Sequence, residues 1–246
     1  MIIAVANQKG GQGKTTTAQA IATGAAQMGR RSLAVDLDPQ ANLTFSMGGN
    51  AADVGVYELM TGKGTPGQTI QRTAQGDLLA ASLALAGADT TFTGETRVNA
   101  LKNALRPLTT RYDVITIDCP PTLNTLLINA LAAADRVIIP LTADMYSLQG
   151  LYLLAQTIRD AQRINNGLQI GGVLFVKHST RTILARDLTD VITDKCRELD
   201  IPVYKTTIRE GVAVREAQTQ RESLLTYAPT SKPAQDYRKF IAELSL

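Results

Sequence analysis

The sequence predicts an α/β fold: a doubly wound, mostly parallel sheet with helices on both faces. Short apolar runs alternate with stretches of helical periodicity along the 246 residues, which is typical of parallel strands joined by crossover helices. Several runs are near-continuous in Val, Ile and Leu, as expected for strands buried on both faces. A glycine-rich segment directly follows the first run and leads into a helix-like stretch.

The elements can be assigned in chain order from these patterns. The strand candidates are Ile2–Ala6, Ser32–Asp36, Leu78–Ala81, Val114–Asp118, Arg136–Pro140, Gly171–Val176 and a shorter run, Val203–Lys205. The helix candidates are Lys14–Met28, Arg97–Leu105, Leu123–Ala134, Leu148–Ile164, Ala185–Leu199, Val212–Gln220 and Ser231–Leu244. The segment Gly48–Gly76 is rich in Gly and Thr and poorly periodic. We therefore expect an irregular excursion there, with one short helix near Val56–Met60.

Length and composition fit one globular domain. Because the sequence opens directly in the first strand candidate, we expect residues 1–246 to form a single domain with no separate N-terminal DNA-binding domain. Hydrophobic residues make up 44% of the chain, but no apolar run is long enough to span a membrane. No secretion signal precedes the first strand, and Cys119 and Cys196 are too few for a disulfide scaffold. These features predict a cytoplasmic protein with buried thiols, and its net charge of +3 permits only a modest nucleic-acid surface.

Residues 9–16 read Lys-Gly-Gly-Gln-Gly-Lys-Thr-Thr, a phosphate-binding loop pattern. The general pattern has a glycine where this chain has Gln8, so the glycines are shifted inward. Gly10, Gly11 and Gly13 still allow backbone N–H groups to converge on phosphate oxygens, and the following helix directs the positive end of its dipole to the same point. A plain glycine turn is the structural alternative, but the flanking strand and helix favour nucleotide binding.

The side chains of this loop carry further chemistry. Lys14 is placed to reach the β- and γ-phosphates, and the hydroxyl of Thr15 suits Mg²⁺. Thr16 is placed to support the α-phosphate. Lys9 is one lysine more than the ordinary loop has. It is either a solvated charge ahead of a turn or a cation for a phosphate that belongs to another subunit.

Acidic residues end two of the strand candidates. Asp118 ends an apolar strand, and an acid at this position beside a phosphate loop can hold Mg²⁺ directly or through water. Asp36 and Asp38 are two positions apart, so they share a face while strand geometry lasts. Pro39 then favours an extended exit at Asp38. One of the two carboxylates could orient or activate a water molecule, although the pair also fits a solvated strand end.

Together these motifs resemble the ParA/Soj/MinD family of deviant Walker ATPases, and the resemblance spans nearly the whole chain. Asn129–Leu131 is similar to the helix after the family's second switch, and Pro140–Gly150 is similar to its next strand exit. Thr207–Ala217, leading to Leu225–Pro229, resembles the distal segment of the partition branch. The main departure is Gln12, where the family usually has Val. A larger polar side chain there is expected to alter dimer packing or turnover without abolishing phosphate binding.

The resemblance implies a P-loop NTPase that forms a nucleotide-switched homodimer around two ATP molecules and hydrolyses ATP to ADP slowly with Mg²⁺. Its catalytic residues would be Lys9, which reaches the partner's phosphates, Lys14, and Asp38, which positions the hydrolytic water. Thr15 and Asp118 would support Mg²⁺, and Asp36 is structural by comparison. The implied nucleotide-binding set is Lys9, Gly10, Gly11, Gln12, Gly13, Lys14, Thr15, Thr16 and Arg209. Loops after Asp38 and Asp118 would act as switches.

In the partition branch the ATP dimer binds DNA without sequence preference, through Lys and Arg on phosphates. The candidates here are Arg181, Lys205 and Arg215, with Arg209 as a further one. Arg209 and Arg215 each lie beside a glutamate, so both also fit solvated surface pairs. The resemblance further implies a ParB-like partner that stimulates hydrolysis and a nucleoid-associated location.

Other branches of the family imply other functions. A positioning ATPase for a non-DNA protein cargo stays open. A MinD-like membrane-bound regulator would need an amphipathic C-terminal helix, and Tyr237, Ile241 and Leu244 have helical spacing. That spacing fits core packing equally well, and the tail lacks the dense basic flank suited to anionic lipid, so no stable membrane binding is expected. The nitrogenase iron-protein branch is excluded because it needs paired cluster cysteines.

Overall fold

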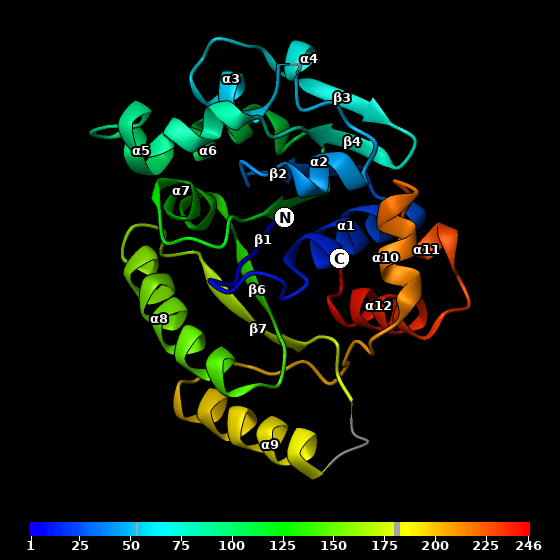
Figure 1. The fold of residues 1–246 in the computed structure, drawn as a ribbon. Coiled ribbons are helices and arrows are strands. Elements are labelled where there is room, and N and C mark those ends of the chain that lie inside the picture. Colours follow the sequence, from blue (N-terminus) through cyan, green and yellow to red (C-terminus); the bar gives the residue numbers. More distant parts are fainter. Residues whose placement is uncertain (53, 180–182) are drawn as a thin grey trace.

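The computed structural model describes residues 1–52, 54–179 and 183–246 and has one seven-stranded sheet (Figure 1). The strands are β1 (Ile2–Val5), β2 (Ser32–Asp36), β3 (Ile70–Thr73), β4 (Gly76–Leu79), β5 (Val114–Asp118), β6 (Arg136–Leu141) and β7 (Gln169–Phe175). Their order is β3-β4-β2-β5-β1-β6-β7, and every neighbouring pair is parallel except β3 and β4. The predicted doubly wound, mostly parallel sheet is therefore confirmed.

Helices connect the strands and continue beyond the last one. They are α1 (Lys14–Gln27), α2 (Asn42–Ser46), α3 (Val56–Met60), α4 (Pro66–Thr69), α5 (Ala88–Thr91), α6 (Thr96–Leu105), α7 (Thr125–Ala133), α8 (Met145–Gln162), α9 (Ile183–Glu198), α10 (Val212–Thr219), α11 (Leu224–Tyr227) and α12 (Lys232–Glu243). Two 3₁₀ turns, η1 (Leu83–Gly87) and η2 (Arg106–Leu108), complete the elements described.

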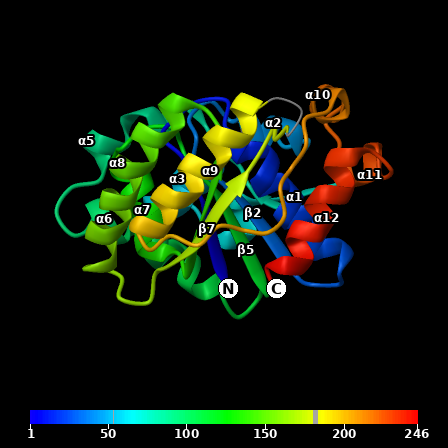
Figure 2. The ribbon, with the colours of Figure 1, turned by 90° about the horizontal axis from the view of Figure 1, so that it is seen from below.

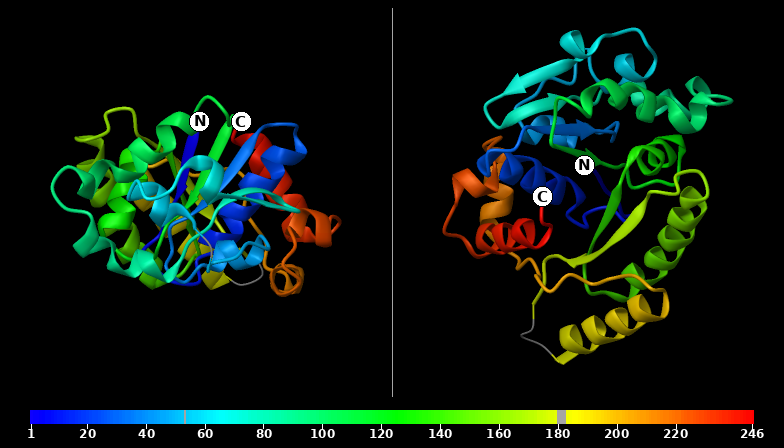
Figure 3. Two further views of the ribbon diagram at one scale, coloured as in Figure 1. Left: turned by 90° about the horizontal axis from the view of Figure 1, so that it is seen from above. Right: turned by 180° about the vertical axis from the view of Figure 1, so that it is seen from behind.

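The sheet separates two hydrophobic clusters because successive strand residues point to opposite faces. In β1, Ile2 and Ala4 pack on the face covered by α3 and by α5 to α9. Ile3 and Val5 pack on the other face, which α1, α2 and α10 to α12 cover. Figure 2 shows these two groups of helices on either side of the strands. The two chain ends lie close together in both views of Figure 3.

The C-terminal helix α12 packs its apolar side against α1. Tyr237, Phe240 and Ile241 are buried, and the Tyr237 hydroxyl lies 3.1 Å from Oγ1 of Thr17. A Cβ on Gly24 of α1 would lie 2.4 Å from Cδ1 of Ile241, so glycine allows the two helices to approach closely. The apolar residues of the tail therefore pack in the core. No helix in the described parts of the chain is long and apolar enough to cross a membrane.

Some expected elements differ in the structure. The predicted strand Val203–Lys205 is wrong: Val203 makes only an isolated bridge to Val173, and the chain then turns toward α10. The excursion Gly48–Gly76 contains the expected helix α3, but also α4 and the edge strand β3. The sequence of β3, Ile-Gln-Arg-Thr, lacks an apolar run because an edge strand buries little of its surface.

The topology brings the carboxyl ends of three strands together. Val5 of β1 is the register partner of Asp118 in β5, and Asp118 is the partner of Asp36 in β2. The loops that leave these strands therefore start side by side, at the edge where open α/β sheets bind ligands. These are the phosphate-binding loop and the segments after Asp36 and Asp118.

Candidate functional site

The loop between β1 and α1 has the backbone needed to hold an anion. Gly11 and Gly13 have φ angles of 74° and 72°, in the left-handed region that favours glycine. Gly13 caps α1 without a side-chain hydrogen bond, and the first turn of the helix has no acidic residue. The N–H groups of this helix end are therefore available to an anion, which the helix dipole also attracts.

Lys14 is the buried cation of the site, with 7% of its surface exposed. Its Nζ donates to the backbone oxygen of Lys9 at 3.2 Å. Burial lowers the pKa of Lys14, and the neighbouring Asp118, Cys119 and Asp38 offset this only in part. An additional anion at the loop would stabilise the charged ammonium, as expected of a phosphate-binding lysine.

Asp118 is buried without a hydrogen-bond partner for either carboxylate oxygen among the described residues. Burial and the neighbouring Asp36 raise the pKa of Asp118 well above its usual value, while Thr15 and Lys14 lower it less. No group of three or more His, Cys, Asp or Glu side chains in the described chain is arranged to hold a metal ion by itself. An unpaired carboxylate beside the Thr15 hydroxyl fits Mg²⁺, which proteins often bind with one or two side chains plus phosphate oxygens.

Asp36 and Asp38 have different surroundings. Asp36 is fully buried and accepts hydrogen bonds from N and Oγ1 of Thr44, at 2.7 and 2.8 Å, and from N of Asp38 at 3.1 Å. Burial raises the pKa of Asp36 to about 6. Oδ1 of Asp38 accepts only from N of Gln40, at 3.0 Å, among the contacts described, and Asp38 lines a cavity. Asp36 thus holds the start of α2, and Asp38 has a carboxylate oxygen available to a ligand.

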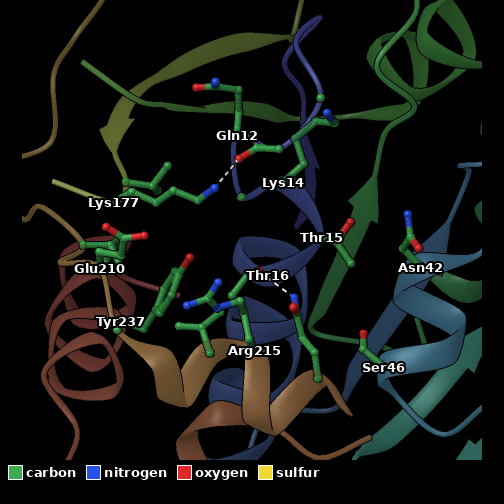
Figure 4. A pocket seen from close by; sticks show the side chains of 18 of the residues that line it. Gln12, Lys14, Thr15, Thr16, Asn42, Ser46, Lys177, Glu210, Arg215 and Tyr237 are labelled. Carbon is green, nitrogen blue, oxygen red and sulfur yellow. Dashed lines mark hydrogen bonds between the residues drawn. The ribbon is translucent and has the colours of Figure 1, made fainter. Parts of the chain in front are cut away.

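A cavity of about 780 Å³ lies over the loop (Figure 4). Of the predicted residues, Gly10, Gly11, Gln12, Gly13, Lys14, Thr15, Thr16, Asp38, Arg209 and Arg215 line it. Its volume is within the range of small-molecule and cofactor sites. The loop forms one wall, and residues of the chain that leads into α10 form the facing wall.

Further residues line the cavity, and no sequence motif marks the contacts that bring them there. Nζ of Lys177, just after β7, donates to the backbone oxygen of Gly11 at 2.9 Å. Nε2 of Gln218, in α10, donates to Oγ1 of Thr16 at 3.0 Å. Tyr237 of α12 also reaches the cavity. Each of them comes to the cavity from a distant part of the chain, so the fold is needed to reveal these contacts.

The predicted basic residues of the distal segment are in different environments. Arg209 lines the cavity, but its Nε and Nη2 bind both carboxylate oxygens of Asp236, at 2.7 and 2.6 Å. Burial raises the pKa of Asp236, and the hydrogen bonds from Arg209 outweigh this, so that the pKa is lowered. Arg215 lies at the exposed rim of the cavity, and Lys205 is exposed away from it. Arg181 lies outside the described residues.

Lys9 does not line the cavity. Its Nζ lies 2.9 Å from each carboxylate oxygen of Asp144, at the start of α8, and 5.7 Å from the centroid of the Tyr146 ring. Its backbone N–H donates to Oδ1 of Asn7 at 2.9 Å. Within the single chain, the extra lysine is therefore paired inside its own subunit. Asp144 lies in the segment Pro140–Gly150 that resembles the family's strand exit, but no pattern in the sequence predicted its contact with Lys9.

Both cysteines are buried and free, as expected. Cys119 follows Asp118, and burial raises the pKa of its thiol. Cys196 lies in α9, where burial raises its pKa to about 11. Neither thiol is therefore activated as a nucleophile.

The chain is similar to known proteins over almost its full length. A family described as an AAA domain matches residues 1–170. The sporulation initiation inhibitor protein Soj of Bacillus subtilis is 38% identical, over 99% of this chain and 98% of that protein. The chromosome-partitioning ATPase Soj of Treponema pallidum is 37% identical, over 97% of this chain and 94% of that protein.

Solved structures share the fold. A Mycobacterium smegmatis protein named cobyrinic acid a,c-diamide synthase, with bound ADP and magnesium, is 36% identical, with a TM-score of 0.86 over 99% of this chain and 93% of that one. The same protein has been solved with an ATP analogue and magnesium.

Proposed function

The chain belongs to the ParA/Soj family of chromosome-partitioning ATPases, and on this premise we propose that it is a Mg²⁺-dependent ATPase whose ATP-bound dimer binds DNA. The observation that carries the proposal is the cavity of about 780 Å³, where the glycine loop, Asp38 and the approach to α10 meet. The structures of the M. smegmatis relative, with ADP or an ATP analogue and magnesium, support ATP and Mg²⁺ as the ligands.

The phosphates of ATP would lie on the loop. Backbone N–H groups of Gly10 to Thr16 and the start of α1 would bind their oxygens, and Lys14 would neutralise the β- and γ-phosphates. Thr15 and Asp118 would hold Mg²⁺, which when bound neutralises the charge on the β- and γ-phosphate oxygens. The nucleoside would extend toward Arg209 and Tyr237, because the cavity continues to them.

Hydrolysis needs an oriented water molecule and a completed site. Asp38 lines the cavity and would accept a hydrogen bond from the attacking water. Asp36 would support the segment that carries Asp38, through Thr44 and the N–H of Asp38. In the ATP dimer, Lys9 would leave Asp144 and contact the phosphates bound to the partner subunit.

DNA binding would depend on basic side chains near α10. Arg215 and Lys205 are exposed, and Arg181 is a third candidate from the sequence alone. Contacts to DNA phosphates carry no sequence information, which suits a protein that binds the nucleoid at many places. A ParB-like partner would stimulate hydrolysis and release the DNA, so that the cycle moves a chromosome or plasmid.

Two substitutions test the nucleotide chemistry. Lys14→Ala should lower ATP affinity by roughly a hundredfold, because the buried phosphate cation is lost. Asp38→Ala should retain ATP but slow hydrolysis at least about a hundredfold, and dimer should accumulate. Isothermal titration, phosphate release and sedimentation measure these quantities.

A surface substitution, Asp160→Ala on α8, is the control and should behave as the wild type. Tight ATP binding by the Lys14→Ala variant would show that the loop does not bind the phosphates. Normal ATP hydrolysis by the Asp38→Ala variant would show that Asp38 has no catalytic role.

A further inference from the structure

Gln12 lies in the phosphate loop, but its side chain binds a different segment. The residue is 3% exposed, and its Oε1 accepts a hydrogen bond from the backbone N of Thr142 at 2.6 Å. The same oxygen lies 2.8 Å from Oγ1 of Thr142. Thr142 directly follows β6 and precedes α8, so Gln12 connects the loop to the start of that helix.

Thr142 continues this connection to Asp144. Oγ1 of Thr142 lies 2.5 Å from Oδ2 of Asp144, and Asp144 caps α8 by accepting from N of Ser147 at 2.9 Å. The Thr142 hydroxyl has one proton for two acceptors, and the charged carboxylate is the stronger one. The backbone N–H of Thr142 is then the group that Gln12 holds, and the hydroxyl is free to orient Asp144.

Asp144 in turn holds Lys9. Burial raises the pKa of Asp144, but hydrogen bonds from Thr142, Lys9 and Ser147 outweigh it and bring the pKa to about 2. The carboxylate is therefore ionised at neutral pH and binds Nζ of Lys9 with both oxygens at 2.9 Å. The two side chains are 34% and 38% exposed, so water screens the pair and the contact is modest in strength.

A phosphate bound to another subunit would compete with Asp144 for the Lys9 ammonium group. We propose that Gln12 is a positioning residue that, through Thr142 and Asp144, retains Lys9 within its own subunit and so opposes ATP-dependent pairing with a second copy of this chain. This inference rests on the proposed function, in which Lys9 acts across the dimer. We call Gln12, Thr142 and Asp144 the Lys9 tether.

The tether explains why a polar side chain stands at position 12. An apolar residue there would leave the N–H of Thr142 without this acceptor and the start of α8 less firmly held. Lys9 would then leave Asp144 more easily. The tether thus sets the concentration of ATP-bound protein at which dimers form. Gln12 raises that concentration because it stabilises the monomer.

The test measures the dimer dissociation constant by analytical ultracentrifugation, with a non-hydrolysable ATP analogue saturating every variant. Gln12→Met keeps the length of the side chain but removes the acceptor, and Asp144→Asn keeps the helix cap but removes the charge. Each should lower the dissociation constant roughly four- to twenty-five-fold, because a partly exposed ion pair contributes about two- to fivefold and both subunits of the dimer release Lys9. The double variant should match the single ones, because both substitutions break one connection.

Thr142→Val and Thr142→Ser give an independent pair of variants if a loop substitution disturbs folding. Valine should lower the dissociation constant as Asp144→Asn does, and serine, which keeps the hydroxyl, should restore the wild-type value. Unchanged constants in all variants, or effects of Gln12→Met and Asp144→Asn that simply add, would overturn the tether while leaving the ATP dimer intact. A wild-type chain that stays monomeric with the analogue would overturn the proposed dimer, and the tether with it.

Discussion

Asp118 and Asp36 place two carboxyl groups next to each other in the core, on neighbouring strands. Burial raises the pKa of both, to about 6 for Asp36 against a reference of 3.8. Between about pH 4 and 6 the folded chain therefore binds more protons than the unfolded chain. The stabilisation that follows is fully present below about pH 4 and is lost as the pH rises through about 6.

This arrangement predicts a pH-dependent stability in the absence of nucleotide. The melting temperature of the wild-type chain should fall as the pH is raised from about 5 to 7.5. Asp118→Asn should reduce that slope, because one of the two carboxyl groups with a raised pKa is gone. Thermal unfolding followed by circular dichroism measures it. Comparing the two slopes removes the contributions of other groups, such as His178.

Asp113→Asn is the matched control. Hydrogen bonds from Arg31 hold the pKa of Asp113, a surface residue, at about 2. Asp113→Asn should therefore leave the dependence of the melting temperature on pH unchanged between about pH 5 and 7.5. Parallel curves for the wild type and Asp118→Asn would show that the core acids are not coupled to folding.

Some residues of the candidate site could be located from the sequence, and the contacts of others could not. The loop motif and the strand ends predicted Gly10–Thr16 and Asp38 as site residues. In the structure these residues line one cavity, because parallel strands bring their carboxyl ends to one edge of the sheet. The contacts that Asp144 and Lys177 make with the loop could not be predicted. Each acts through one contact with the loop across more than a hundred positions of sequence, and no local pattern encodes such a contact.

At the scale of elements, α10 and the segment just after it link the cavity to α2 and the turn that follows α2. Gln218 of α10 binds Thr16, and Arg221, just after the helix, donates to the backbone oxygens of Phe45 and Gly49 at 3.0 and 2.8 Å. The Arg221 guanidinium also lies 5.0 Å from the centroid of the Phe45 ring. Arg221 therefore connects α2 directly to the end of α10.

Arg215 on α10 provides the test of DNA binding. Arg215→Ala should weaken binding about equally for all DNA sequences and reduce the dependence of log K on log salt by about one, as expected for one lost phosphate contact. Fluorescence anisotropy at several salt concentrations measures both effects.

The control for this prediction is Arg163→Ala. Arg163 is 83% exposed in a surface pair with Asp160, away from the cavity, and its loss should leave the salt dependence unchanged. Because Arg215 lines the cavity, ATP affinity is measured as well. A loss of ATP affinity with an unchanged salt slope would assign Arg215 to the nucleotide.

Long elements were easier to predict from the sequence than short ones. The period of α8 and of α12 spans several turns, so their existence followed from the pattern, although α8 begins at Met145, earlier than the expected Leu148. The helix α2 and the strand β3 have five and four residues, too few for a period to show. In the folded chain α2 is stabilised by packing against α1, and β3 by pairing with β4.

At the scale of the whole molecule, ATP would act on an equilibrium between single chains and dimers. In the single chain Lys9 is held by Asp144, and the cavity is open at its rim, where Arg215 lies. ATP would shift the population toward the dimer only by as much as the dimer binds it more tightly than the monomer does. The contacts of Lys9 with the partner's phosphates would supply part of that difference.

Sedimentation combined with DNA binding, for the wild type and Lys9→Ala in ADP, in ATP and in a non-hydrolysable analogue, measures whether Lys9 drives the ATP-dependent dimer. The wild type should be monomeric and bind DNA weakly in ADP, and dimeric with tight DNA binding in the analogue. Lys9→Ala should bind the nucleotides but stay monomeric and leave DNA unbound. If Lys9→Ala dimerises and binds DNA like the wild type, Lys9 does not act across the dimer. If wild-type DNA binding is equal in all three nucleotides, ATP does not switch it.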